Sequence, residues 1–377
     1  MSGQAGRSKA STRLAAVLST RRLVPAAAVI ALAAAAGCAS SGSTGAAAAN
    51  SSSPAVGSAS PPAGPGGSAA ALQQAYVSVV KRTLPSVVEI QTSSGLGSGV
   101  VFNAAGDIVT NAHVVGTATK FKVLLSDSAS PRNATLVGRY LPDDLAVIKV
   151  SDTASLRPAV FADSSKLAVG DIVLAIGAPL GLTSSVTEGI VSATGRTVSE
   201  PSGEGSPGAT LPDTIQTSAS INPGNSGGAL VDLAGQVAGI PTLAATDQQL
   251  GGAAPGIGFA ISSNTVTLIA RQLVASGHVT NSGRAALGVG VSTVAGSDGA
   301  PAGAGVISVT AGGPAAKAGI KAGSVITSVN GTPTPDVQSL SAVLAGLRPG
   351  DTAKVAVTTA DGKHETVSVK LGQLPST

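Results

Sequence analysis

The chain has 377 residues, enough for two domains with tails, and a formal net charge of +4. Five basic residues and no acidic ones precede Cys38, which leaves 18 basic and 19 acidic residues for the rest of the chain. This balance excludes a basic face for nucleic acid, so no nucleic-acid partner is expected. Cys38 is the only cysteine, which excludes an intrachain disulfide.

Residues 1–37 have the pattern of an export signal: a basic start, an apolar run over residues 23–36 and small residues before Cys38. The run is too short to span a bilayer comfortably. A small-residue pair before a lone cysteine resembles a bacterial lipobox, so we expect lipidation at Cys38 and an exported envelope protein on the outer face of the cytoplasmic membrane. An ordinary cleaved signal and an uncleaved N-terminal anchor remain open. The paired Arg21 and Arg22 also leave Sec and twin-arginine export open.

Residues 38–70 are almost entirely Ala, Gly, Ser and Pro, which predicts a flexible tether with a reach of roughly 30 Å. Folded sequence begins near Leu72, where apolar residues recur at helical spacing up to Pro85. Short runs rich in β-branched residues and separated by turn residues then predict an all-β barrel protein. We expect strands over 87–92, 99–102, 107–110, 120–125, 135–140, 146–150, 172–176, 189–193, 214–217, 229–232, 237–240 and 256–260, followed by a helix over 263–276.

The segment Ile221–Gly228 places Ser226 among closely spaced glycines between two strand-like runs. Glycine allows a tight turn and lets a substrate carbonyl approach the main chain. Two backbone N–H groups, from Gly224 and Ser226, can then point at one oxygen beside a nucleophile, which is the geometry of an oxyanion hole. From this segment alone, a Gly-rich surface turn that happens to carry a serine is an equal alternative.

A nucleophilic serine needs a base and an acid that orients it. Of the three histidines, His113 follows an apolar strand pattern, whereas His278 and His364 lie in a helix end and a hairpin turn and are expected to be exposed. Asp143 and Asp144 directly precede an apolar strand, and on chemistry alone either carboxylate can hold the imidazole. With either of them the order along the chain is His, Asp, Ser, as in chymotrypsin.

These motifs, taken in order, closely resemble the HtrA (Deg) type of serine protease over roughly residues 72–372. The matching segments are Gly95–Val100, Thr110–Val115, Asp144–Val147, Ala175–Gly177, Gly189–Ala193, Asn222–Gly228 and Gly256–Ile261. The resemblance implies a mainly β protein, with a trypsin-like double β-barrel over residues 71–277 followed by a PDZ domain (α+β) over residues 284–373. Ser218 and the stretch 178–180 depart from the usual family pattern, which leaves fine specificity open.

The resemblance implies a catalytic triad of His113, Asp144 and Ser226, with Asp143 at a variable position. The oxyanion hole is assigned to Gly224, Asn225 and Ser226. In the trypsin template the pocket-floor carboxylate lies six residues before the nucleophile, where this chain has Ser220. A pocket lined by Ser220 and Ile221 is expected to take a small aliphatic side chain rather than Lys or Arg.

The C-terminal unit resembles a PDZ domain, with Leu287-Gly288-Val289 as its carboxylate-binding loop. Such domains bind an extended C-terminal peptide by strand addition. A helix is expected over 335–346, with Thr334 as its N-cap and Pro335 at its first position. The alternative is a PDZ domain used only for intramolecular packing.

Two classes of function follow. The first is an exported serine endopeptidase that cleaves unfolded or damaged proteins through an acyl-enzyme, and the complete set of triad residues favours it. The second is a proteolytically quiet PDZ scaffold or chaperone. The family resemblance implies a homotrimer, with residues 71–84 as the expected contact. No cofactor and no metal are expected.

Overall fold

The computed structural model describes residues 66–92, 95–128, 130–178, 185–200, 209–222, 224–247, 252–296 and 299–374. The expected export signal, Cys38 and most of the expected tether lie outside these residues, so the interpretations made for them stay predictions. None of the helices formed by the described residues has both the length and the apolar character needed to cross a membrane.

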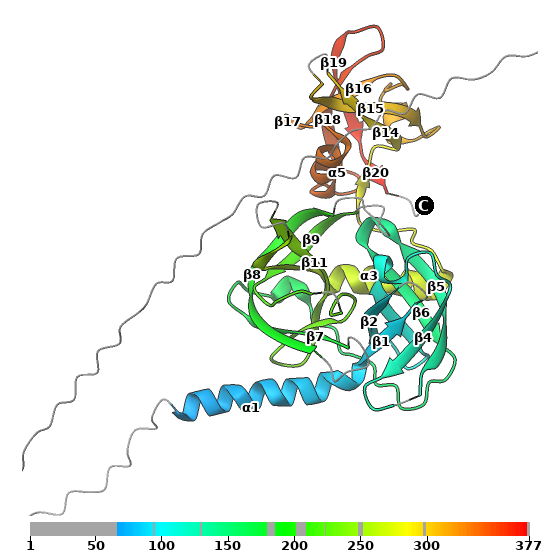
Figure 1. Ribbon diagram of the computed structural model, residues 1–377. Helices are drawn as coiled ribbons and strands as arrows, with labels where there is room; N and C mark the ends of the chain where they lie inside the picture. Colours follow the sequence, from blue (N-terminus) through cyan, green and yellow to red (C-terminus); the bar gives the residue numbers. More distant parts are fainter. Residues whose placement is uncertain are drawn as a thin grey trace, which may run out of the picture. The chain divides into compact units, whose positions relative to one another are not determined.

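Most of the secondary-structure elements are strands, with a few helices between them (Figure 1). In chain order they are α1 (Gly66–Thr83), η1 (Leu84–Ser86), β1 (Val87–Gln91), β2 (Leu96–Val101), β3 (Asp107–Asn111), α2 (Ala112–Val115), β4 (Lys120–Leu125), β5 (Arg132–Tyr140), η2 (Leu141–Asp143), β6 (Leu145–Val150), η3 (Ser164–Lys166), β7 (Ile172–Gly177), β8 (Ser185–Glu200), β9 (Ala209–Thr217), β10 (Ala229–Asp232), β11 (Val237–Asp247), β12 (Gly252–Ser262), α3 (Ser263–Ser276), β13 (Ala285–Ala286), β14 (Val289–Ala295), β15 (Pro301–Val309), α4 (Pro314–Lys317), β16 (Val325–Val329), β17 (Thr332–Pro333), α5 (Val337–Ala345), β18 (Thr352–Thr358), β19 (His364–Lys370) and β20 (Gly372–Gln373).

The first barrel closes in the antiparallel order β1-β2-β3-β6-β5-β4. Strand β6 shows why its sequence is a continuous apolar run rather than an alternating one. Its Ala146, Ile148 and Val150 belong to a core drawn from this barrel and α2, while Leu145 and Val147 belong to a core shared with the second barrel and α3. Because successive side chains point to opposite faces of a strand, both faces of β6 are buried, except at Lys149, which is exposed.

The second barrel closes in the antiparallel order β10-β11-β12-β9-β8-β7. Its hairpins extend beyond the strands expected from sequence, since β8 and β9 pair as far as Glu200↔Ala209, and β11 and β12 as far as Asp247↔Gly252. Register shifts interrupt both ladders. The extensions are rich in Gly, Ala, Ser and Pro, so β propensity does not reveal them, and backbone pairing is what makes them strands.

Helix α3 is where the two barrels share a core. Its Val266, Ile269, Ala270 and Leu273 are buried with side chains of both barrels. The helix ends at Gly277, which adopts a left-handed conformation (φ +76°) and donates its N–H to the Leu273 carbonyl. The expected helix over 263–276 is confirmed.

Helix α1 precedes the first barrel and extends away from it (Figure 1). It begins at Gly66, inside the stretch that composition assigned to the tether, and ends just before Pro85. Of its apolar side chains, Val79 is buried against the shared core, whereas Leu72 is 41% exposed. Only the C-terminal part of α1 is therefore integrated into the barrels.

The C-terminal unit is a sheet in the order β14-β15-β16-β18-β19, with β17 paired to β16 and a separate β13-β20 pair. Leu340 of α5 is buried with Ile326 and Val329 of β16. The expected N-cap at Thr334 is wrong: the helix begins at Val337, and the side chain of Asp336 accepts from Ser339 N at 2.7 Å. Thr334 is fully buried and bonded to β16, since its N–H donates to the Thr327 carbonyl.

Candidate active site

His113 and Asp144 lie at the adjacent ends of two paired strands of the first barrel. β3 and β6 pair with Asn111 opposite Leu145, so the residues that follow β3 and precede β6 are neighbours. His113 lies in the short helix α2, whose first residue, Ala112, donates its N–H to the Asp144 carbonyl at 3.0 Å. The side-chain amide of Asn111 donates to the same carbonyl at 3.1 Å.

The Asp144 carboxylate holds His113 by two contacts. One oxygen accepts from the His113 backbone N–H at 2.9 Å, and the other lies 2.8 Å from Nδ1 of the ring. The second oxygen also accepts from Thr242 Oγ1 of β11 at 2.6 Å. The His113 side chain is 24% exposed and that of Asp144 4%. With Nδ1 directed at a buried carboxylate, Nε2 is the ring nitrogen that would exchange a proton with a nucleophile.

The two adjacent aspartates point to different partners. Asp143 is the last residue of η2, and Asp144 follows it in the left-handed region (φ 49°), where its N–H donates to the Leu141 carbonyl. The Asp143 carboxylate accepts from Arg284 Nη1 at 2.8 Å. The structure thus brings Asp144, and not Asp143, to His113.

Ser226 lies in the loop between β9 and β10, in a backbone that depends on glycine. Gly224 and Gly227 have φ values of +114° and +80°, which side chains other than glycine rarely adopt. A Cβ on Gly227 would also lie 2.3 Å from the Ser98 carbonyl oxygen. The Gly227 N–H donates to the Pro241 carbonyl, and Ser226 Oγ lies 3.5 Å from the Thr242 carbonyl oxygen. Thr242 therefore adjoins both Ser226 and Asp144.

Asn225 was also assigned to the oxyanion hole, and in this structure its backbone N–H donates to the Asn222 carbonyl at 3.1 Å. Its side chain is also engaged, accepting from Asn222 N and donating to the Ser220 carbonyl, both at 3.0 Å. Asn225 is 3% exposed, and its hydrogen bonds stabilise the loop. Among the described residues, the N–H groups of Gly224 and Ser226 donate to no acceptor.

Ser98 supports this loop from the first barrel, and sequence reasoning missed it. Its hydroxyl donates to the Gly224 carbonyl at 2.5 Å and accepts from Ala178 N at 2.9 Å. Its N–H donates to the Ser226 carbonyl at 3.0 Å, and its own carbonyl accepts from Thr110 Oγ1 at 2.6 Å. The glycines on either side of Ser98 were the available signal, because they mark a close approach of chains. Thr242 was also missed, and no local pattern identifies it.

The residues proposed for the substrate pocket lie beside this loop. Ile221 is 5% exposed, and a Cβ on Gly258 would lie 2.3 Å from its Cγ1, so Ile221 fills the space in front of β12. Ser220 is exposed, and its carbonyl accepts from Thr187 and Asn225. The two nearest acids in sequence are engaged elsewhere: Asp213 accepts from Ser262 Oγ and Asp232 from Gln236 N.

The other histidines are remote from these contacts. His278 and His364 are both exposed, as expected, with ring nitrogens 2.9 Å from the Ser276 carbonyl oxygen and 3.0 Å from Thr358 Oγ1, respectively. This arrangement leaves His113 as the histidine that faces a buried carboxylate.

Comparison with known proteins identifies both units. Residues 97–240 match the family of trypsin-like peptidase domains, and residues 285–371 match the PDZ domain family. The chain is 41% identical over 300 residues to the serine protease Do-like HtrA of Lactococcus lactis subsp. cremoris, covering 75% of this chain and 72% of that protein. The chain belongs to the HtrA family of serine proteases.

Other HtrA relatives are longer. A probable periplasmic serine endoprotease, DegP-like, of Bartonella henselae is 40% identical over 314 residues, and the alignment covers 81% of this chain but 59% of that protein. Among solved structures, the HtrA-type protease AlgW with a decapeptide has a TM-score of 0.54 and 31% identity, covering 80% of this chain and 99% of that one. A serine endoprotease from Yersinia pestis has a TM-score of 0.53 and 34% identity, with 79% and 98% covered.

The PDZ domain of this HtrA chain has its expected carboxylate-binding loop at the start of an edge strand. Leu287 is buried and Gly288 has a φ of +72°. The carbonyls of both are used internally, accepting from Ala315 N at 2.8 Å and Thr310 N at 2.9 Å, respectively. β14, which begins at Val289, is an end strand of its sheet, so its outer edge has the position that strand addition requires.

Proposed function

We propose that this chain is an exported serine endopeptidase in which Ser226, His113 and Asp144 act as a triad. Ser226 Oγ attacks the carbonyl carbon of the scissile peptide while His113 Nε2 takes its proton. The C–N bond then breaks, His113 returns the proton to the leaving amine, and water hydrolyses the acyl-enzyme by the same route. The observation that carries this proposal is the buried hydrogen-bond chain from Thr242 through Asp144 to His113.

The oxyanion of the tetrahedral intermediate would be held by the N–H groups of Gly224 and Ser226. Ser98 supports this role, because its bond to the Gly224 carbonyl fixes one side of the loop. Preorganised donors of this kind stabilise charge that develops only in the transition state, and one such donor is worth about 10²–10³ in rate.

The pocket chemistry favours a small aliphatic side chain before the scissile bond. Ile221 fills space beside β12, and the nearest acids in sequence have partners of their own. A Lys or Arg side chain would therefore meet no counter-charge at Ser220. Cleavage-site profiling tests this, and a profile made up mainly of Lys and Arg would contradict it.

The substrates we propose are unfolded or damaged proteins, and the PDZ partner is a C-terminal peptide bound at Leu287–Val289 along β14. The edge position of β14 supports strand addition. The solved AlgW structures with a decapeptide and a tripeptide show that relatives of this chain are found with peptides.

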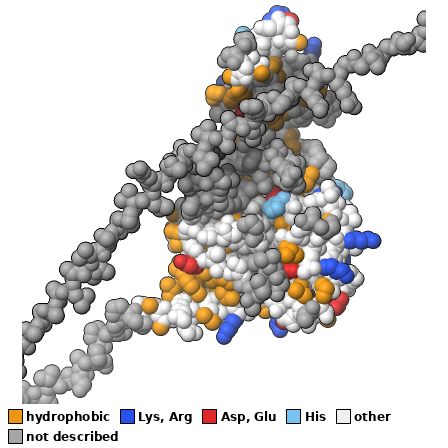
Figure 2. Space-filling model, viewed as in Figure 1, with side chains coloured by type: hydrophobic (Ala, Val, Ile, Leu, Met, Phe, Trp, Pro, Cys, Tyr) orange, Lys and Arg blue, Asp and Glu red, His pale blue; other side chains and the backbone are white. Residues whose placement is uncertain are grey.

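We also propose export to the cell envelope, lipidation at Cys38 and a homotrimer. Relatives named as periplasmic proteases support export. Figure 2 shows hydrophobic side chains gathered where α1 meets the barrels, and the exposed large ones on α1 and β8 are Leu72, Val77, Val186 and Ile190. Such a patch suits a second copy of the chain. Mapping the mature N-terminus tests lipidation, because any start other than residue 38 contradicts it.

The endopeptidase is tested by a fluorophosphonate probe together with casein cleavage. Wild type should be labelled and cleave casein, and Ser226→Ala should lose both. Ser276→Ala removes an exposed hydroxyl at the end of α3 and should behave as wild type. An unlabelled wild type that still binds C-terminal peptides would favour a quiet PDZ scaffold instead.

A further inference from the structure

Asp143 is a buried carboxylate that the proposed chemistry does not use. It is 1% exposed, and its counter-charge comes from Arg284, which is 9% exposed and lies far along the chain in the segment that leads into the PDZ domain. Taking two charges out of water is costly, and removing one partner then leaves the other unpaired. A pair so close to Asp144 therefore calls for a specific role.

Arg284 holds the turn that sets the backbone of Asp144. Its Nη1 donates to the Pro142 carbonyl at 2.5 Å and to Asp143 Oδ1 at 2.8 Å, so one guanidinium nitrogen bonds two consecutive residues of η2. Directly after this turn, Asp144 adopts a left-handed conformation, which costs energy for a residue other than glycine unless its surroundings hold it. The two Arg284 bonds supply that restraint from outside the barrel strands.

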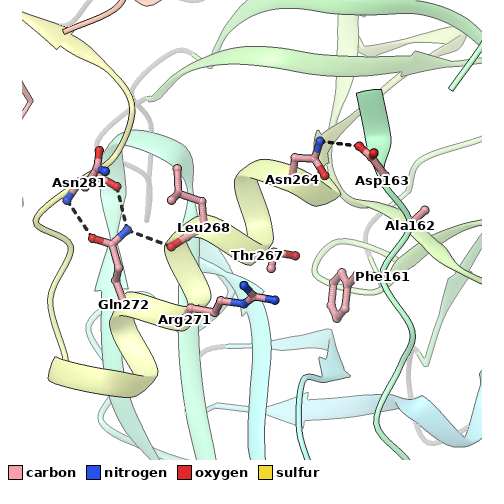
Figure 3. Close-up of a pocket in the computed structure, with 9 residues that line it drawn as sticks. All are labelled: Phe161, Ala162, Asp163, Asn264, Thr267, Leu268, Arg271, Gln272 and Asn281. Carbon is pink, nitrogen blue, oxygen red and sulfur yellow. Dashed lines mark hydrogen bonds between the residues drawn. The ribbon is translucent and has the colours of Figure 1, made fainter. Parts of the chain in front are cut away.

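Arg284 is itself anchored at both ends of its segment. On the side nearer α3, Gln272 donates to the Asn281 carbonyl at 2.7 Å and accepts from Asn281 N at 2.8 Å (Figure 3), and Val279 is buried in the shared core. On the other side, the Arg284 carbonyl accepts from Leu374 N at 2.9 Å, and Ala285 pairs with Gln373. The guanidinium therefore projects from a segment that is held on both sides of Arg284.

We propose that Arg284 is a positioning residue for the triad aspartate, acting through Pro142 and Asp143, so that the segment entering the PDZ domain is part of the support of the active site. The proposal rests on the assignment of Asp144 to the triad. Burial raises the pKa of Asp143 to about 6, with Arg284 opposing the rise, so the pair is ionised at the mildly alkaline pH of the assay.

The test uses the full chain and a peptide substrate with a small aliphatic residue before the scissile bond. Its C-terminus is amidated, which removes the carboxylate that the PDZ loop is proposed to bind. Arg284→Gln should lower kcat roughly tenfold with KM little changed, because Asp144 acts in the transition state rather than in substrate binding. Arg284→Lys should recover most of the rate, and Arg271→Gln, an exposed arginine on α3, should match wild type.

Two further measurements separate positioning from other roles. In the pair cycle, Asp143→Asn with Arg284→Gln should be no slower than the slower single variant, since both act through one contact. The acid limb of the kcat/KM profile should move to lower pH in Arg284→Gln, because a displaced Asp144 stabilises the His113 imidazolium less. A purely electrostatic effect predicts no shift to lower pH, since removing the cation either leaves the Asp143 anion uncompensated or raises the pKa of Asp143 until it is neutral.

Wild-type kcat in a folded Arg284→Gln, additive losses in the cycle, or a limb that does not move to lower pH would each overturn the inference. So would a lower melting temperature with unchanged kcat, which shows a structural role only. If Arg284→Gln does not fold, kcat and the acid limb are compared instead among wild type, Arg284→Lys and the double variant Asp143→Asn with Arg284→Gln. If wild type showed no activity that depends on Ser226, the proposed function would be rejected instead.

Discussion

The two barrels hold their halves of the active site in different ways. In the first, His113 and Asp144 adjoin a paired strand end, so the ladder between β3 and β6 brings them together. In the second, Ser226 lies in a loop outside any strand, and bonds from elsewhere hold that loop. Ser98 reaches it from the first barrel and Pro241 from β11.

The first barrel therefore positions its residues mainly by strand pairing, whereas the second positions its serine by hydrogen bonds from distant segments. Strand register brings the acid and the base together, and each residue of β3 and β6 helps to specify it, while Thr242 and Arg284 refine the position of Asp144 from other segments. The nucleophile loop instead depends on single side chains, so one substitution in another segment can displace it. Variants at chosen residues of each barrel test this comparison.

The largest expected effect is at the carboxylate of the first barrel. Asp144→Asn should lower kcat by about 10⁴, because the amide favours the wrong imidazole tautomer while keeping the shape of the side chain. Steady-state cleavage of casein and of a short peptide measures it. The control is Asp152→Asn, whose side chain is 60% exposed. Near-wild-type cleavage by Asp144→Asn would show that the acid is wrongly assigned.

Next comes the support of the nucleophile loop. Ser98→Ala removes the bond to the Gly224 carbonyl and the acceptor for Ala178 N, in a side chain that is fully buried. We expect kcat to fall by up to about 10², the lower end of the cost of losing one oxyanion donor. The variant should also bind a peptide boronate, which mimics the tetrahedral intermediate, more weakly.

Ser98→Thr and Ser128→Ala complete that comparison. The threonine keeps the hydroxyl and should recover part of the rate if its methyl group is accommodated. Ser128 is half-buried in the connection between β4 and β5 and makes none of these contacts, so its variant should equal wild type. Unchanged boronate affinity in Ser98→Ala would mean that the loop holds its shape without this hydroxyl.

A smaller effect is expected where the barrels meet at Asp144. Thr242→Val keeps the shape of the side chain but removes the 2.6 Å bond to the carboxylate, a hydrogen bond to a charged group. Such bonds are worth about 1.5–3 kcal/mol, so kcat should fall roughly tenfold. Thr214→Val is the matched control, since Thr214 is also fully buried and donates to a backbone carbonyl, that of Arg196. Equal rates in the two variants would show that the Thr242 hydroxyl does not help to position Asp144.

The difference between strand pairing and long-range contacts also explains what the sequence could predict. Regular strands of the first barrel, the helix over 263–276 and the neighbourhood of His113 and Asp144 follow from apolar runs, turn residues and motif order. The hairpin extensions of β8 and β12 do not, because backbone pairing rather than side-chain preference creates them.

Side-chain contacts across the fold were beyond sequence reasoning. Ser98 and Thr242 lie far along the chain from the residues they support, and Arg284 lies 141 residues after Asp143, in the segment that leads into the PDZ domain. The bond from the Asn225 N–H to the Asn222 carbonyl within the loop was equally beyond sequence reasoning. Asp143 and Asp144 were chemically equivalent in sequence, and the family resemblance alone assigned the triad position to Asp144; the structure adds their different partners, Arg284 for Asp143 and His113 for Asp144.

The last expected effect is on stability and leaves the rate at assay pH unchanged, and it comes from the protonation of Asp143. Burial raises its pKa to about 6 from an ordinary 3.8, while the charge of Arg284 opposes the rise. Between about pH 4 and pH 6 the folded protein therefore keeps a proton that the unfolded chain has released. Stability falls with rising pH wherever the folded state binds more protons, so this carboxyl lowers stability across that window by on the order of 3 kcal/mol.

Thermal unfolding of wild type and Asp143→Asn from pH 4 to pH 8 measures this contribution. The melting temperature of wild type minus that of the variant should fall between pH 4 and pH 6 and stay level above pH 7, where the carboxyl is ionised in both states. Asp152→Asn should show no such slope, because that side chain is mostly exposed. A difference that rises with pH would mean that the attraction of Arg284 outweighs burial, so that the pair stabilises the turn before Asp144 as well as orienting it.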